Sequence, residues 1–438
     1  MSGSYAITPN FGLKKPVTGA DDGLWGTHWN ANADTLDATL KQHADAIAAN
    51  VPVGGPFLPI AGGALAGPGN LTVGGTLNTT NAAGFQQNGS TILNVFGSGD
   101  GSGANTLVGY QAGLALPGTD NESTFVGYRA GWSTSGTQLE NTYVGWSAGS
   151  LGTTAQFNAA LGVNALGHNV TSSNVVALGN DAIRNSLTVP NSIAIGSSAM
   201  RDNNQSFSVA IGTQALQGVL QADPPGNPSS SGSNNIAIGF QSLRGPASTT
   251  ITNNIAIGPN TAPGITSANN NIIVGSGAGQ SITSGPENLL LGTLAGTSLT
   301  TAFGNVMIGH LAGRHVTGAT NILIGDQVGQ SITTGHDNIV IGTSAAKTNL
   351  TTGSFNIIVG FGPNADTAAG ATNNTFAVFG PNAQPIILVT NTQTTTPAFF
   401  LPGLAASPSY ANDAAAAGSG VGIGQLYRNG SAVQVRVT

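Results

Sequence analysis

A short phrase of polar and apolar positions recurs about sixteen times between residues 105 and 383. A full copy has Asn, three apolar residues, Gly, two variable residues and a small residue, and Asn254-Ile-Ala-Ile-Gly258 shows its first half. Most key glycines, from Gly109 to Gly380, follow one another at intervals of 16 to 18 residues. A period of this length predicts a stacked solenoid, in which each repeat buries apolar surface against its neighbours.

The three apolar residues predict a short strand, and side chains on a strand alternate between its two faces. We expect the first and third residues of each triplet to fill the lumen of the coil. The key Gly then turns the chain through backbone angles that other residues resist. Ala stands three residues after the key Gly in twelve of sixteen copies, which indicates close approach of another backbone.

The middle residue of the triplet is expected to point away from the lumen, yet it is apolar in each of the first fifteen copies. A strand that is apolar on both faces is normally buried on both faces, and a continuous exposed apolar stripe is rare in monomers. The pattern therefore predicts lateral association of parallel copies in a ring. The candidate interface residues are Leu107, Phe125, Tyr143, Ala194, Ala256, Ile273, Leu290, Met307, Leu323, Val340 and Ile358.

The Asn four residues before the key Gly recurs in eleven copies. Stacked coils would bring these amides about 4.7–4.8 Å apart, a spacing at which they form a hydrogen-bonded ladder. The alternative is an array of amides that binds sugar. We favour the ladder because the Asn occupies a fixed strand edge.

The chain outside the repeats divides into three further segments. Residues 1–50 form a separate N-terminal segment whose predicted helix, over 30–49, has a heptad seam that predicts self-association or packing on another protein. Residues 51–104 are a Gly- and Pro-rich linker with short strands, including 71–73 and 91–95. Residues 384–438 form a C-terminal β tip with strands at 385–390, 425–427 and 432–437, the last two joined at an Asn-Gly turn.

Composition narrows the functional classes. Charged residues make up only 6% of the 438 residues and the net charge is −6, so nucleic acid is an unexpected partner. The absence of Cys excludes thiolate metal sites and cysteine nucleophiles. The N-terminal residues lack the pattern of a secretory signal, and no run of 18 apolar residues indicates a membrane helix. We therefore expect synthesis in the cytoplasm and no membrane insertion.

Candidate chemistry is sparse in this chain. Asp120 and Glu122 are the best pair of acids for a glycan-degrading site, but their spacing in a loop is more typical of solvated charge. His310 follows a key Gly and has no neighbouring His that would complete a metal site. The Gly-rich run Gly97–Gly103 lacks the Lys of a phosphate-binding loop. We expect no catalytic residue, no metal and no cofactor.

A few aromatic residues and one loop are candidates for binding. Tyr110, Tyr128 and Trp146 directly follow key glycines in the first three repeats, and Trp132 is close to them in sequence. Such rings either stack on sugars or shield the open end of the solenoid from water. The long insertion over 217–234 predicts a protruding loop, where binding residues often lie.

These phrases resemble those of a known class of proteins. Asn105-Thr-Leu-Val-Gly-Tyr-Gln-Ala-Gly113 is similar to the head repeats of trimeric autotransporter adhesins and more closely to the NTxxGxxAG repeats of phage tail-fibre proteins. Phe57-Leu-Pro-Ile-Ala-Gly-Gly-Ala-Leu-Ala-Gly-Pro68 is similar to a linker common in such fibres, and residues 11–30 and 424–435 resemble their two ends. The period near 17 is longer than the adhesin repeat.

The resemblance implies an all-β homotrimer with a parallel β-solenoid, or β-roll, as shaft, a short N-terminal helical or coiled-coil segment and a small C-terminal β region. It implies a non-enzymatic tail fibre of a bacteriophage virion that joins the tail or baseplate through its N-terminus and meets a host surface receptor, such as a glycan. The alternatives are a capsid or neck fibre, a glycan-degrading tailspike and a bacterial surface adhesin.

Overall fold

The computed structural model describes only part of the chain, and its contacts divide the chain into two units, Met1–Asn78 and Thr79–Thr438. Several predictions fall outside the described residues, namely Asp120, the strand over 71–73, the Gly-rich run 97–103 and most of the 217–234 insertion. The described residues are 5–7, 14–16, 35–43, 45, 85–87, 90–96, 105–115, 122–133, 140–168, 171–218, 231–246, 250–380, 384–390, 398–400, 411, 413–419, 421, 426–429 and 432–435.

The first unit contains β1 (Tyr5–Ile7) and β2 (Lys14–Pro16), which pair antiparallel. Residues 35–43 have helical backbone, within the range where a helix was predicted. Association of that helix with other copies stays a prediction. Among the described residues, no helix is long and apolar enough to cross a membrane.

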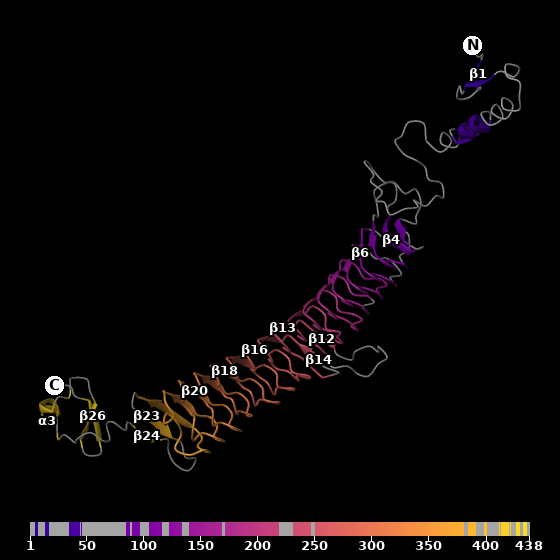
Figure 1. Ribbon diagram of the computed structural model, residues 1–438. Helices are drawn as coiled ribbons and strands as arrows, with labels where there is room; N and C mark the ends of the chain where they lie inside the picture. The colour runs from indigo at the N-terminus through magenta and orange to yellow at the C-terminus, as the bar shows by residue number, and fades with distance from the viewer. Residues whose placement is uncertain are drawn as a thin grey trace. The chain divides into compact units, whose positions relative to one another are not determined.

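The second unit is dominated by a parallel β-solenoid, visible as a row of short arrows in Figure 1. Each predicted phrase forms one strand, and we number the coils 1 to 16 by these strands. The strands are β5 (Asn105–Val108), β6 (Thr124–Val126), β7 (Thr142–Val144), β8 (Ala159–Leu161), β9 (Val176–Leu178), β10 (Ile193–Ile195), β11 (Val209–Ile211), β13 (Ile236–Ile238), β15 (Ile255–Ile257), β16 (Ile272–Val274), β17 (Leu289–Leu291), β18 (Val306–Ile308), β19 (Ile322–Ile324), β20 (Ile339–Ile341), β21 (Ile357–Val359) and β22 (Thr375–Phe379).

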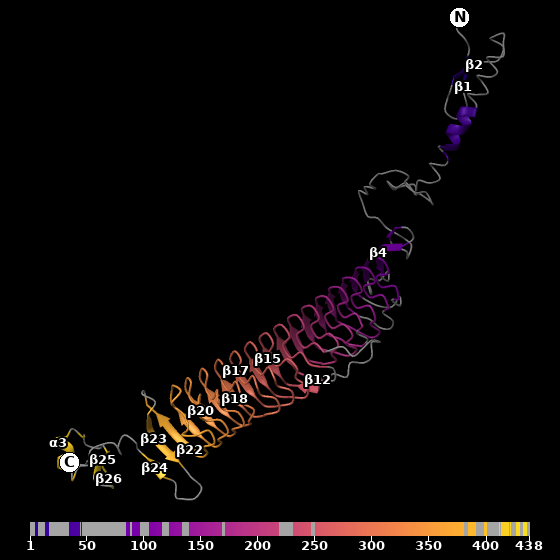
Figure 2. The same cartoon turned by 60° about the horizontal axis from the view of Figure 1, so that its bottom comes forward.

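Neighbouring strands pair in parallel and in register, so each position of the phrase forms a column along the solenoid. In β15 and β16, for example, Ile255 pairs with Ile272 and Ala256 with Ile273. The turned view in Figure 2 shows the strands stacked in chain order along one side. The predicted solenoid is therefore confirmed.

Antiparallel strands flank the two ends of the solenoid. β3 (Phe85–Gln87) and β4 (Ser90–Phe96) lead into β5, and β23 (Pro385–Thr390) and β24 (Ala398–Phe400) continue from β22. A separate parallel pair, β12 (Ser231–Ser233) and β14 (Thr250–Thr252), lies between coils 7 and 9. The strands predicted over 91–95 and 385–390 are thus confirmed.

The C-terminal residues contain the predicted hairpin, formed by β25 (Leu426–Asn429) and β26 (Ala432–Val435). They also contain a short helix that the sequence analysis did not predict, α3 (Asp413–Gly418).

The predicted orientation of the triplet is wrong. The middle residue points into the coil of its own chain, and the first and third residues point outward. The physical reason is the residue before each triplet, Asn in eleven copies, which is buried inside the coil. Alternation along the strand then places the middle residue on the same side. The predicted interface residues are interior residues with at most 5% exposure: Leu107, Phe125, Tyr143, Ala194, Ala256, Ile273, Leu290, Met307, Leu323, Val340 and Ile358.

The interior is filled by two columns whose side-chain sizes compensate. Where the middle residue is large, the residue four after the key Gly is usually Gly: Phe125 occurs with Gly131, and a Cβ added to Gly131 would lie 2.5 Å from the Phe125 ring. Where the middle residue is Ala, the other position usually holds a large buried side chain, as with Ala194 and Met200. Close packing requires this reciprocity, because each coil encloses about the same volume.

Candidate functional site

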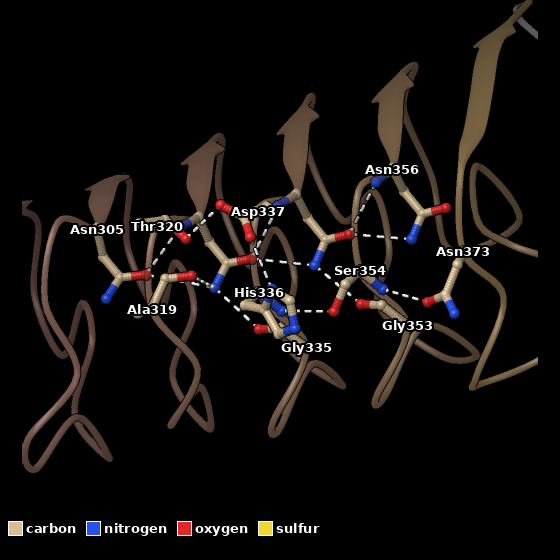
Figure 3. A network of polar contacts seen from close by, with 12 residues as sticks. Asn305, Ala319, Thr320, Gly335, His336, Asp337, Gly353, Ser354, Asn356 and Asn373 are labelled. Carbon is tan, nitrogen blue, oxygen red and sulfur yellow. Dashed lines mark hydrogen bonds and ion pairs between the residues drawn. The ribbon is translucent and has the colours of Figure 1, made fainter.

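The repeated Asn forms a buried ladder inside the solenoid, as predicted. The Asn321 Oδ1 accepts hydrogen bonds from the backbone N–H of Asn338 at 3.1 Å and from its Nδ2 at 3.0 Å. The Asn321 Nδ2 donates in turn to the Gly335 carbonyl at 3.0 Å. Figure 3 shows the same arrangement continuing to Asn356 in the next coil. The side chains of Asn321, Asn338 and Asn356 have no exposed surface, so the alternative of a sugar-binding amide array is wrong for these coils.

Replacing Asn321 with Ala is expected to reduce the free energy of unfolding by about 2–4 kcal/mol, because buried donors and acceptors in both neighbouring coils would lose a partner. Asn321→Ser is the matched control. Ser occupies the same position in coil 7, where the Ser208 hydroxyl accepts from the Asn235 N–H at 3.2 Å. Denaturant unfolding followed by circular dichroism should show a clearly smaller loss for Ser; equal losses would argue against the ladder as the cause.

The outward side of the repeat sheet is the most prominent candidate site. In coils 5 to 15 the first and third residues of every triplet are Val, Ile or Leu, and in this single chain none of them is buried. Ile272 is 43% exposed and Ile341 is 39% exposed. We call this surface the outward apolar face and define it as the first and third triplet positions of coils 5 to 15.

The size of the outward apolar face indicates what it does. Eleven parallel strands spaced by about 4.8 Å cover a length of about 50 Å, and a width of about 10 Å then gives on the order of 500 Å². That is as large as the largest apolar patch of a typical monomer and more than half of the roughly 800 Å² that each partner contributes to a stable complex. A surface of this size is suited to an interface.

The aromatic candidates form a stack on the side of coils 1 to 3. The ring centroids of Tyr110 and Tyr128 lie 5.6 Å apart and those of Tyr128 and Trp146 lie 6.1 Å apart, both in stacked geometry. The Arg129 guanidinium lies over the Tyr128 ring at 5.2 Å and over the Trp132 ring at 4.7 Å. The faces of the middle ring, Tyr128, are therefore already engaged, which leaves its edge for a sugar. Glycan contact stays a prediction.

The same rings do not shield the edge strand of the solenoid. β4 pairs with the edge of coil 1 at β5, whereas Tyr110, Tyr128 and Trp146 occupy the column after the key Gly. Their exposed fractions range from 37% to 49%. These three rings thus lie along the border of the repeat sheet that directly follows the key glycines.

Several charged side chains in the described residues pair with one another. Arg201 lies 3.1 Å from Asp202 and 3.8 Å from Asp181, so both carboxylates share one guanidinium. His310 pairs with Asp326 at 2.9 Å. The hydroxyl of Thr320 and the ring of His336 hydrogen-bond to Asp337 and lower its carboxyl pKa. Within the described ranges, no group of three or more His, Asp or Glu side chains is placed to hold a metal ion.

Comparison of the chain with protein-family models, with curated proteins and with solved structures gives no match in any of the three. The function must therefore be argued from the molecule itself.

Proposed function

We propose that this protein is a structural, non-enzymatic fibre: a homotrimer whose solenoids run parallel with their outward apolar faces turned towards one another. The observation that carries the proposal is the outward apolar face, which covers coils 5 to 15 without a polar interruption. Association of parallel copies would remove it from water at roughly 25 cal/mol per Å² of apolar surface. The threefold order is implied by the resemblance of the repeats to those of trimeric adhesins and tail fibres.

The same resemblance supports a place on a bacteriophage virion. The N-terminal segment would attach to the tail or baseplate and the remainder would meet the host cell surface, with a glycan as one class of receptor. A capsid or neck fibre is the alternative placement. A glycan-degrading tailspike is less well supported, because four of the eight described carboxylates of the repeats, Asp181, Asp202, Asp326 and Asp337, each contact a basic side chain.

Two measurements test the proposal. Light scattering of the purified chain should give three times the chain mass of 43.3 kDa, about 130 kDa. Imaging of labelled virions should place the protein on a fibre. A monomer in solution would overturn the assembly, and a label on the capsid shell or neck would move the fibre away from the tail.

Replacing Ile272 with Lys distinguishes the role of the sheet in the stability of one coil from its proposed role in the contact between chains. Ile272 is 43% exposed in the single chain, so a Lys there should change coil stability by less than about 1 kcal/mol. In the assembly, three unpaired ammonium groups would be buried near the axis, and we expect dissociation into monomers with intact β structure. The control is Gln280→Lys, an exposed site in the same coil that lies outside the strand and its two borders. A trimer that survives Ile272→Lys would argue against this face as the contact.

A further inference from the structure

Exposed aromatic side chains of the coils concentrate at the two borders of the repeat sheet. We define the N border as the one or two residues before the buried residue that precedes each triplet, which is Asn in most coils. The G border is the residue after the key Gly. Within the described residues of coils 1 to 15, every aromatic residue exposed by more than a third lies at one of these borders. The N border carries Phe157, Phe207, Phe303 and Phe355, and the G border carries Tyr110, Tyr128, Trp146, Phe240 and Phe361.

Three phenylalanines of the N border have a backbone conformation that is unfavourable for them. Phe157, Phe207 and Phe355 have φ values of 58°, 52° and 60°, in the left-handed region that bulky side chains avoid. Several other coils have Asn at the same position, including Asn191 and Asn270, and Asn tolerates this region. Each of the three rings is also about half exposed, at 46% to 57%. Within the described residues, Phe157 and Phe207 make no ring contact that would favour Phe over Asn, and Phe355 makes one edge contact, with His336.

Three of the four N-border phenylalanines have an exposed aromatic residue at the G border within one coil, about 4.8 Å along the solenoid, and Phe303 has none. Phe355 and Phe361 both belong to coil 15. Phe207 of coil 7 is matched by Phe240 of coil 8, and Phe157 of coil 4 is matched by Trp146 of coil 3. Within one chain a strand separates the borders: the six residue-to-residue steps from Phe355 to Phe361 span up to about 20 Å, too far for the rings to meet.

We propose that in the assembly the N border of one copy packs against the G border of the next, so that these matched rings form contacts between chains. The occupant of each border is a second copy of this chain, and the inference rests on the parallel assembly proposed above. A cyclic assembly of parallel copies joins two different borders of the same surface at equal height.

The absence of cysteine from the chain allows a direct test with paired cysteines. Asn270 and Ser276 are exposed residues at the N and G borders of coil 10. The double variant Asn270→Cys with Ser276→Cys, treated with a short bis-maleimide, should give products of linked chains under denaturing conditions. Each single variant treated in the same way should remain unlinked.

The outcomes separate this inference from the proposed function. Linked products in a single variant would mean that like borders meet, which overturns the inference. No linkage in the double variant, with three chains still present by light scattering, would also overturn it and leave the trimer standing. A closed product of three chains supports both, whereas two chains as the largest product of a complete reaction would support the border contact and contradict threefold order. A monomeric protein would overturn the trimer and the inference together.

A second test uses the strain of the border phenylalanines. Changing Phe157, Phe207 and Phe355 together to Asn should leave the circular dichroism of the coils intact, since Asn suits the left-handed backbone. The dissociation constant of the assembly should rise about ten-fold or more with the loss of three ring contacts in each copy. The matched control is Leu114→Asn, which removes an apolar side chain that is 61% exposed but lies outside both borders. Unchanged dissociation of the triple variant would contradict the inference.

Discussion

Replacing Gly325 with Ala is expected to reduce the free energy of unfolding by at least about 4 kcal/mol, because it breaks the turn that follows a strand in the middle of the solenoid. Gly325 has a φ of 143°, which side chains resist strongly. A Cβ there would also lie 2.6 Å from both the carbonyl carbon and the carbonyl oxygen of Gly342 in the next coil. Neither atom belongs to a movable side chain, so the backbones of coils 13 and 14 must separate.

Gly304→Ala is the control for the Gly325 variant, because it makes the same substitution at another positive φ. Gly304 has a φ of 64°, and a Cβ there would approach only a Thr320 methyl group, at 3.4 Å. We expect a cost of about 1–2 kcal/mol, the ordinary penalty of the left-handed region. Denaturant unfolding measures both variants, and hydrogen exchange should show the Gly325 defect concentrated around residues 325 and 342. Similar costs at the two sites would contradict the close approach of the coils.

The repeat itself could be predicted from the sequence, but the direction of its side chains could not be derived from the triplet alone. All three residues of Asn271-Ile-Ile-Val-Gly275 are apolar, so alternation does not say which of them is inside. Two signals in the chain do decide it. The polar Asn271 needs buried partners in the neighbouring coils, and Ile273 shares its face of the strand. The middle residue also varies in size against the residue four after the key Gly, as residues that share a cavity do.

The candidate site was predicted only in its general character. Lateral association was predicted because the strand is apolar on both faces. The prediction remains after the orientation is corrected, because Ile272 and Val274 take the place of Ile273 on the outward side. Pairing the aromatic residues of the two borders requires the register of the coils, which only the structure provides. Phe207 and Phe240 are 33 residues apart in the chain because an insertion lies between them, yet they occupy adjacent coils. Spacing in the sequence alone does not reveal that match.

The reciprocal filling of the coil interior predicts a second large effect, in coil 6. Ala194→Leu alone should cost about 1–3 kcal/mol or more, because the Met200 side chain already fills the same space. Met200→Gly alone should cost about 2–5 kcal/mol through the cavity it leaves, reduced by the relief of a left-handed backbone at φ 50°. Together the changes give coil 6 the pairing of coil 11, where Leu290 occurs with Gly296 and an added Cβ would lie 3.0 Å from the leucine side chain.

A double-mutant cycle measured by denaturant unfolding tests this pairing. We expect the double variant to be more stable than the sum of the single effects predicts, by at least about 1 kcal/mol, because residues that share a cavity couple by this amount. The reciprocal exchange in coil 11, Leu290→Ala with Gly296→Met, should show coupling of the same sign. Effects that simply add, within about 0.5 kcal/mol in both coils, would mean that the two columns do not share volume. Coupling in both coils would establish that size compensation between these columns, more than the identity of any one residue, determines which sequences can close a coil of this solenoid.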